Sequence, residues 1–303
     1  MITRVTQATV RQSTLANLQA NLNKMSDLQA QMSSGKKINL PSDDPAGASD
    51  MMRLRSEQRV LTQYTRNAQD GNAWLTTVDT AITTSLANLR QVRDLTVRGG
   101  NGSLGDSARQ ALAAEISGLK DSLLEQSNTT YLGRSVFAGT SADAAFTVVP
   151  PNPPTTTVPS YTFSGVPGST VTRQVADGTS IRVDSDGSAV FGQDPDTVFA
   201  LLDSIVATLN AGGDPSDQLT AIDSHLDAMQ TELSGVGARE NQVDNALSRI
   251  TDQQLTAKTR LSSIEDVDLA EIILDVQTQE VAYKGALGAT AKVLQPTLLD
   301  YLR

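Results

Sequence analysis

The sequence predicts a mostly α-helical protein, a long antiparallel helical bundle or coiled coil that carries a small β-rich insertion. Three observations indicate this fold class. Apolar residues recur at alternating steps of three and four over several long stretches, which is a heptad pattern. Aromatic residues make up only 4% of the 303 residues, so a compact core has few bulky anchors. One block, residues 134–193, instead alternates apolar and polar residues as strands do.

Two of the heptad stretches lie at the ends of the chain. Residues 1–42 carry five Lys or Arg and one Asp, whereas residues 265–303 carry three Lys or Arg and seven Asp or Glu. Unlike charges favour the encounter of two helices, although exposed pairs add little stability. Each end therefore needs a partner helix, from its own chain or from a neighbour. The predicted interface residues are Leu15, Leu18, Leu22, Met25, Leu269, Ile273, Val276, Leu287, Leu294, Leu298 and Leu299.

Each terminal helix is bounded by a hinge. Gly35 is a plausible C-cap for the first helix, since glycine adopts the left-handed conformation that ends many helices. Pro41 and Pro45 then bracket Asp43 and Asp44, where a carboxylate can cap the helix that follows. The second hinge lies at 262–268.

Between the hinges, the pattern predicts long helices. The first runs over about 46–98, with Gly71 marking a bend or a close approach. After a turn at 98–106, Asp106 or Ser107 caps a second helix, which makes an antiparallel hairpin with the first. A further helix begins at Asp194-Pro195, and residues 219–254 keep the heptad phase without a slip.

The expected domains follow from these boundaries. Residues 1–45 and 265–303 form a terminal coiled-coil domain, 46–133 and 194–264 form a long-helix rod, and 134–193 form a β-rich variable outer domain. Stretches within this last block, such as SVFAGT, YTF and SIRVDSDGSAVF, are expected as strands.

No pattern indicates an enzyme, a cofactor or a metal. Asp43 and Asp44 have nothing nearby to complete a catalytic or metal site. Asp184-Ser185-Asp186-Gly187 begins like a calcium loop but lacks its later ligands, so a hairpin turn is expected there. His225 is the single histidine and the chain has no Cys, so His225 has no such partner for a metal.

Charge and hydropathy limit the partners. A net charge of −10 argues against nucleic-acid binding. No run of eighteen apolar residues predicts a membrane span, and no cleavable signal peptide is expected at the N-terminus.

Particular motifs resemble the bacterial flagellin superfamily. They are Ser33-Ser34-Gly35-Lys36 with Pro41-Ser42-Asp43-Asp44-Pro45-Ala46-Gly47, Gly237-Ala238-Arg239-Glu240-Asn241, and Ser263-Ile264-Glu265-Asp266-Val267-Asp268. The resemblance covers about 1–140 and 195–303. Within the superfamily, the start Met1-Ile2-Thr3-Arg4-Val5-Thr6, the segment Arg134-Ser135-Val136-Phe137-Ala138-Gly139 and the ending Leu298-Leu299-Asp300-Tyr301-Leu302 are more similar to the hook-filament junction branch, the third hook-associated proteins.

That resemblance implies a structural protein of the bacterial flagellum. It would be exported uncleaved by the flagellar type III apparatus, guarded by a cytosolic chaperone at its C-terminal helix, and would form a ring of about eleven copies. Another hook-associated protein would lie on the hook side and flagellin on the filament side. Residues 15–32 and 269–299 would form an inner tube between subunits.

Two other interpretations remain. A flagellin, the bulk subunit of the filament, is the main alternative. An enzyme in a flagellin-like frame is remote, because the β-rich block has no His, Cys or Lys.

Overall fold

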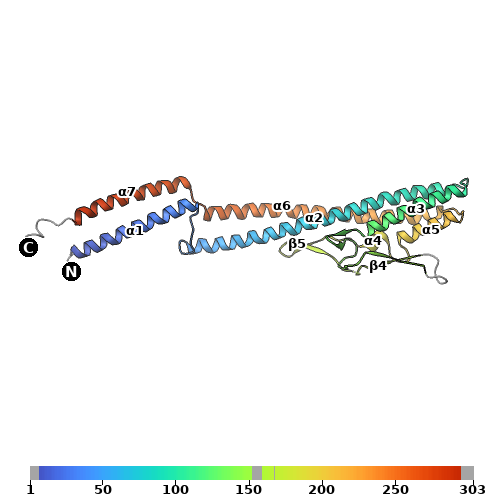
Figure 1. Cartoon of the computed structure of the whole chain (residues 1–303), viewed down its shortest axis with the longest axis horizontal. Helices are drawn as coiled ribbons and strands as arrows, with labels where there is room; N and C mark the ends of the chain where they lie inside the picture. Colours follow the sequence, from blue (N-terminus) through green and yellow to red (C-terminus); the bar gives the residue numbers. More distant parts are fainter. Residues whose placement is uncertain (1–6, 152–158, 167, 295–303) are drawn as a thin grey trace, which may run out of the picture. The chain divides into compact units, whose positions relative to one another are not determined.

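The computed structural model describes residues 7–151, 159–166 and 168–294 (Figure 1). It confirms a mostly helical fold. The helices are α1 (Gln7–Ser34), α2 (Pro45–Gly99), α3 (Asp106–Ser127), α4 (Gly187–Phe191), α5 (Val198–Asn210), α6 (Leu219–Glu265) and α7 (Leu269–Leu294), with a 3-10 turn at Ser216–Gln218. The chain divides into two compact units, Met1–Val60 with Gln253–Arg303, and Leu61–Asp252.

The larger unit, Leu61–Asp252, holds one hydrophobic core. The heptad predicted for α6 is confirmed, because Ile222, Met229, Val236 and Val243 are all buried in this core. Gly71 of α2 lies where strand β5 and the end of β6 approach, since a Cβ there would meet Val183 Cγ1 at 3.1 Å. Because Gly71 has no side chain, the β5–β6 part of the insertion packs close against α2 at this position.

Among the described residues, the β-rich block and the segment just before it form three separate antiparallel hairpins. They pair β1 (Thr130–Tyr131) with β2 (Arg134–Ser135), β3 (Phe146–Val149) with β4 (Ser160–Phe163), and β5 (Thr172–Ala176) with β6 (Thr179–Arg182). All five Phe gather in one aromatic cluster that includes Phe199 of α5 and Phe146 of β3, with ring centroids 5.2 Å apart. The block expected as an outer domain therefore shares its core with the helices of the larger unit.

Two expectations within the block were wrong. The SVFAGT stretch contributes only Ser135 to a strand, and Gly187–Phe191 forms α4 rather than a strand. Asp186 accepts hydrogen bonds from the backbone N of Ser188, at 2.9 Å, and from its hydroxyl, at 2.7 Å. The Asp184–Gly187 stretch is consequently a helix cap and not a hairpin turn, because local capping outweighs the alternation of apolar residues.

Two predicted helix starts also moved. The N-cap of α3 is Gly105, which is extended, and Asp106 is the first helical residue. The negative charge of Asp106 there interacts favourably with the positive end of the helix dipole. Helix α5 begins at Val198 rather than at Asp194-Pro195. Thr197 is its cap, since its hydroxyl accepts from Ala200 N at 3.1 Å, and Pro195 lies in the preceding turn, in which Asp196 N donates to Gln193 O.

Candidate assembly site at the terminal helices and their hinge

Helices α1 and α7 lie side by side and antiparallel within the smaller unit (Figure 1). The expected pairing of the two ends is therefore made within one chain. On α7 the less exposed positions are Ile272, Val276, Gln279, Tyr283, Ala286 and Thr290, and on α1 they include Leu18, Asn21, Met25 and Leu28. Both sets advance by steps of three and four, as facing helices require. We call these two sets the inner seam.

The inner seam contains one polar contact. Gln279 Nε2 donates to the side-chain oxygen and to the backbone carbonyl of Asn21, both at 3.2 Å. Near the hinge the seam is well packed, because Leu28 and Ile272 are 8% and 4% exposed. Toward the other end of α7, Thr290 is buried and donates to the Ala286 carbonyl at 2.7 Å.

A second set of large apolar residues on the same two helices faces solvent. We call it the outer stripe; its members are Leu15, Leu22 and Met32 on α1, and Leu269, Ile273, Leu274, Val281 and Leu287 on α7. Large apolar side chains that stay exposed along a pair of helices commonly mark an interaction site.

The predicted interface residues divide between these two surfaces. Leu18, Met25 and Val276 are half-buried in the inner seam. Leu15, Leu22, Leu269, Ile273 and Leu287 belong to the outer stripe. The Leu294 side chain, Leu298 and Leu299 lie outside the described residues. The prediction from the sequence thus placed residues of both sets in one interface, and it missed Ile272 and Gln279 of the inner seam.

The hinge joins the inner ends of α1 and α7. Gly35 has φ +68° and its N donates to Gln31 O, so it ends α1 in the left-handed conformation expected of it. Next to it the two hinge strands meet in an antiparallel bridge, in which Lys37 N donates to Glu265 O at 2.6 Å and Val267 N donates to Gly35 O at 3.2 Å. The two hinges predicted from the sequence are therefore directly bonded to each other.

Glu265 supplies the charge at this bridge. Its side chain is only 6% exposed and pairs with Lys36 and, at 2.7 Å, with Arg55 of α2. The hydrogen bond from Lys36 lowers the pKa of Glu265, burial opposes this, and Arg55 lowers the pKa further. Glu265 was expected as a hinge residue, while Lys36 and Arg55 were missed because their partner is about 210 residues or more away in the chain.

The two neighbouring aspartates have different local roles. Asp43 Oδ2 accepts from Asn39 N and Leu40 N at 3.1 and 2.8 Å, which closes the turn that contains Pro41. Asp44 Oδ1 accepts from Ala46 N and Gly47 N at 3.1 and 3.0 Å, so Asp44 caps α2 and Pro45 is its first residue. The capping interpretation of this pair is confirmed.

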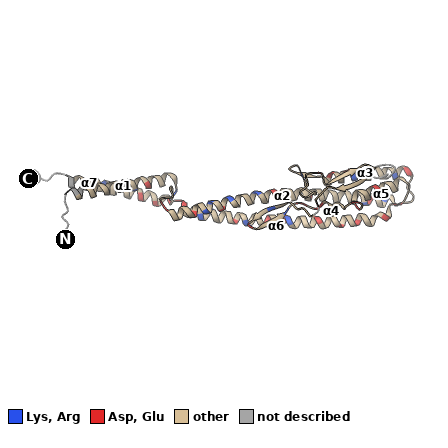
Figure 2. Cartoon of the chain, turned by 90° about the horizontal axis from the view of Figure 1, so that it is seen from below, with Lys and Arg blue, Asp and Glu red and all other residues tan. Residues whose placement is uncertain are grey.

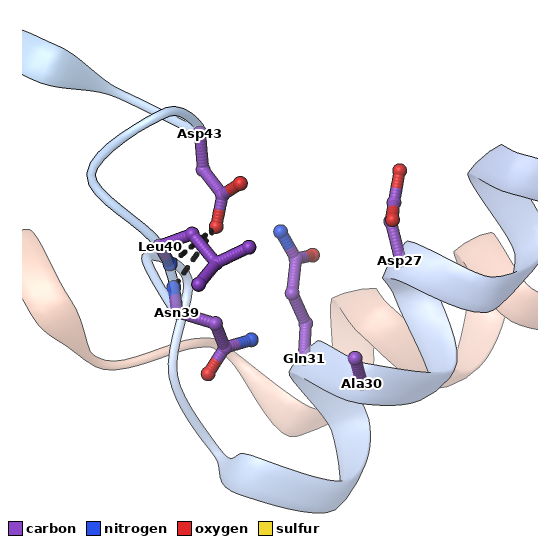
Figure 3. Close-up of a pocket in the computed structure, with 6 residues that line it drawn as sticks. All are labelled: Asp27, Ala30, Gln31, Asn39, Leu40 and Asp43. Carbon is purple, nitrogen blue, oxygen red and sulfur yellow. Dashed lines mark hydrogen bonds between the residues drawn. The ribbon is translucent and has the colours of Figure 1, made fainter.

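The rest of the hinge is a small apolar cluster with two hollows beside it. Ile38, Ala48 and Met51 are buried there against Leu261 and Ile264. One hollow, of about 380 Å³, is lined by residues of this turn together with Met51, Met52 and Arg55. The other, of about 300 Å³, is lined by Asp27, Ala30, Gln31, Asn39, Leu40 and Asp43 (Figure 3).

Two of the predicted hinge or motif residues lie away from the hinge. Arg239 and Asn241 are in the middle of α6, in the larger unit, where Arg239 donates to the Asp184 carbonyl and Asn241 to the Gly237 carbonyl. Arg239 therefore ties α6 to the insertion rather than to the hinge. Asp266 is at the hinge, where it accepts a hydrogen bond from the Ser262 hydroxyl at 2.5 Å.

The described residues offer no grouping of three or more His, Asp or Glu that suits a metal ion. His225 is half-buried, and its desolvation lowers its pKa. Over the same residues, no helix is both long and apolar enough to cross a membrane.

Comparison with protein families gives two matches. Residues 5–142 match the bacterial flagellin N-terminal helical region, and residues 219–302 match the bacterial flagellin C-terminal helical region. The two matched regions contain α1, α2, α3, α6 and α7 together with the hinge, and they leave out most of the insertion.

Curated relatives of two kinds match along nearly the whole chain. A flagellin of Bacillus subtilis is 27% identical over 296 residues, covering 93% of each chain. Flagellar hook-associated protein 3 of Escherichia coli is 26% identical over 313 residues, covering 92% of this chain and 96% of the relative.

Solved structures share the fold. A putative flagellar hook-associated protein from Vibrio parahaemolyticus aligns with a TM-score of 0.66 at 21% identity, covering 74% of this chain and all of that one. The flagellar junction protein FlgL from Legionella pneumophila aligns with a TM-score of 0.58 at 15% identity, covering 71% and 99%.

Proposed function

Because this chain belongs to the bacterial flagellin family, we propose that it is the structural adaptor between hook and filament in the bacterial flagellum. Its copies assemble through α1 and α7, and it acts as a building element and not as an enzyme. The junction role is supported by likeness along almost the full length of a hook-associated protein 3.

The observation that carries the assembly mechanism is the outer stripe. The apolar residues of the inner seam are already covered by the packing of α1 against α7. Leu269 and Leu274 nevertheless remain 56% and 63% exposed. Exposed leucines on a helix cost free energy in water, about 25 cal/mol for each Å² that a partner would cover. A neighbouring subunit that covers the stripe recovers this free energy, which makes the terminal pair the assembly surface.

The surrounding partners follow from the junction role. About eleven copies close into a ring, with another hook-associated protein on the hook side and flagellin on the filament side. The protein reaches this site through the flagellar type III route. Before export, a cytosolic chaperone covers the outer stripe of α7, which otherwise exposes apolar surface in the cell.

Flagellin is the second candidate. It is favoured by the 27% identity to the Bacillus subtilis flagellin over 93% of the chain. The two candidates differ in what the pure protein does, because a flagellin polymerises on itself whereas a junction protein adds a bounded layer to the hook.

Electron microscopy of the purified protein, alone and with isolated hooks, tests this proposal. We expect soluble subunits that cap hook ends and then allow added flagellin to grow. Long filaments grown from this protein alone would assign it as a flagellin instead.

A pair of variants tests the proposed surface. We expect Leu287→Asp, in the outer stripe, to keep the helical content of the subunit and to abolish capping, since an aspartate cannot be buried unpaired. Val166→Asp is the matched control, because Val166 is similarly exposed but lies in the insertion. Normal capping by Leu287→Asp would refute the assignment of the outer stripe.

A further inference from the structure

The turn between α2 and α3 contains the single Asn-Gly pair of the chain, Asn101-Gly102. Both residues are exposed, and a Cβ added at Gly102 would have no neighbouring atom within 4 Å. Because glycine has no side chain, its backbone nitrogen is less hindered than that of any other residue, and the backbone around it rotates more freely. This turn therefore places an accessible side-chain amide next to an unhindered backbone nitrogen.

Hydrogen bonds hold the Asn101 side chain against this turn. Its Oδ1 accepts from Ser103 N at 3.1 Å, while the Asn101 backbone carbonyl accepts from Leu104 N at 3.1 Å. A bond from an Asn side chain to the backbone two residues ahead is an Asx turn. The Ser103 N–H also polarises the side-chain carbonyl. It thus lies where negative charge develops if a nucleophile attacks Asn101 Cγ, and a donor so placed stabilises that charge.

We propose that Asn101 is a site of spontaneous modification, at which its side chain closes a ring onto the backbone and loses ammonia. The deprotonated Gly102 nitrogen attacks Asn101 Cγ and forms an N–C bond, in a reaction favoured because both groups belong to one turn. The Cγ–Nδ2 bond breaks, and Nδ2 leaves as ammonia with the proton that Gly102 N gave up. Water then opens the five-membered imide at either of its two carbonyls, which leaves aspartate or isoaspartate at position 101. No oxidation or reduction takes place.

Other asparagines in turns lack a free attacking nitrogen. Asn39 is also exposed in a turn, but Leu40 N donates to Asp43 Oδ2 at 2.8 Å. That bond has to break before Leu40 N can attack. The Asn128 amide is bonded on both sides to the backbone of β3, at 2.9 Å each. In the part of the chain that the structure describes, no hydrogen bond engages Gly102 N, so Asn101 is selected by its surroundings as well as by its sequence.

The product changes the charge at this end of the larger unit. Gly100, next to Asn101, lies against the turn that precedes α6, since a Cβ there would meet Asp214 Oδ1 at 3.0 Å. Figure 2 shows acidic residues at this end of the unit, where α3 and α5 are labelled. A carboxylate at position 101 adds a charge of the same sign beside them, which is unfavourable. The reaction needs only this turn and water, so it goes beyond the proposed function and does not rest on it.

Peptide mass spectrometry on the full folded chain tests this proposal. The tryptic peptide 99–109 contains Asn101 as its only Asn, peptide 38–53 contains Asn39 as its only Asn, and neither contains Gln. After incubation in mildly alkaline buffer, we expect peptide 99–109 to lose its amide about ten times faster than peptide 38–53, which corresponds to a barrier lower by about 1.4 kcal/mol. The amount of product present before incubation is subtracted. Equal rates in the two peptides would overturn the proposal.

Gly102→Ala is the matched variant for the attacking nitrogen. The added methyl group has open space, so the turn keeps its hydrogen bonds while the nitrogen becomes more hindered. We expect the loss of the Asn101 amide to slow about tenfold, again a barrier change of about 1.4 kcal/mol. An unchanged rate would mean that water hydrolyses the side chain directly, without the ring, and would contradict the proposal.

The products give an independent readout. Ring opening yields both isomers, and isoaspartate is detected because an isoaspartyl methyltransferase labels it, whereas direct hydrolysis yields aspartate alone. We expect isoaspartate in peptide 99–109 and a rate that rises with pH, because the attacking species is the deprotonated nitrogen. Aspartate without isoaspartate, or a rate independent of pH, would each refute the ring mechanism.

Discussion

Glu265 holds the hinge of the smaller unit through one carboxylate. Lys36 precedes the bridge on the N-terminal side and Arg55 belongs to α2, so the Glu265 carboxylate links segments from both ends of the chain. Because its two cations are 46% and 48% exposed, solvent screens these pairs. Because the Glu265 side chain is itself nearly buried, its charge state affects the stability of the hinge.

Acidification should loosen this hinge. The pKa of Glu265 is lowered in the folded chain, so its stabilising contribution is fully present above the unfolded pKa of about 4.3 and is lost as pH falls through the folded value. We expect faster hydrogen exchange at Lys37 N and Val267 N in that window. Glu265→Gln should abolish this pH dependence and cost about 1–2 kcal/mol at neutral pH.

Glu280 supplies the control for this experiment. It is also a carboxylate with a lowered pKa, but its partner is Lys284 on the same exposed turn of α7. Glu280→Gln should leave exchange at the hinge unchanged. An equal effect of the two substitutions would mean that the hinge senses net charge and not the Glu265 contacts.

Two ion pairs of the larger unit should contribute differently to the free energy of unfolding. Lys120 and Asp203 are 14% and 13% exposed and share a hydrogen-bond network with Tyr161, whose pKa is raised to about 12 by burial and by Asp203. Arg93 and Asp223 are 41% and 47% exposed. In urea unfolding we expect Asp203→Ala to cost about 3 kcal/mol. Asp223→Ala should lower the free energy of unfolding much less, because solvent screens the exposed Arg93–Asp223 pair. Similar losses would contradict the role assigned to burial.

At the scale of elements, α7 carries buried and exposed apolar residues at neighbouring positions. Ile272 is in the inner seam, while Ile273 and Leu274 are in the outer stripe. The sequence pattern gives the heptad period of such a helix, but not which of two adjacent stripes faces its own partner. That choice depends on packing against α1, for which the period alone holds no information.

A matched pair of substitutions separates the two stripes. Ile272→Asp should detach α7 from α1, because it buries a carboxylate in the inner seam, at a cost of about 3 kcal/mol or more. Leu274→Asp, two residues away, should leave the pair intact. Hydrogen exchange of α1 amides measures the difference, and equal protection of α1 in both variants would show that the seam is assigned wrongly.

The elements of the insertion were harder to predict than the long helices. Heptads over tens of residues average out local exceptions, so α2 and α6 begin and end close to where the pattern places them. In the block that follows Tyr131, single caps decide the outcome, as Asp186 and Thr197 do. Contacts between distant segments, such as Arg239 with the Asp184 carbonyl or Arg173 with Asp70 at 2.6 Å, leave no periodic signal.

At the scale of the whole molecule, the two compact units have cores of very different size. In the smaller unit the buried apolar cluster of the hinge comprises three residues, Ile38, Ala48 and Met51. In the larger unit one core includes the buried Trp74 and the cluster of all five Phe. A unit with little buried apolar surface opens at a lower free energy than one with a large core.

Chemical unfolding should therefore proceed in two steps. The single Trp lies in the larger unit, so its fluorescence reports that unit alone, whereas circular dichroism at 222 nm reports helix in both. We expect part of the dichroism to be lost at a lower urea concentration than the fluorescence change. Coincident transitions would instead indicate that the chain unfolds as one cooperative body.

The amide contact between Asn21 and Gln279 has a consequence for how the two ends of the chain find each other. If α7 slipped along α1 by one heptad, Asn21 would face Ile272 or Ala286, and Gln279 would face Leu28 or Thr14. In most of these shifted alignments a side-chain amide faces an apolar side chain and has no hydrogen-bond partner. This costs free energy that the observed alignment does not incur. A single polar contact in an apolar seam thus fixes the register of the two helices. It disfavours the shifted registers that their shared heptad period would otherwise allow.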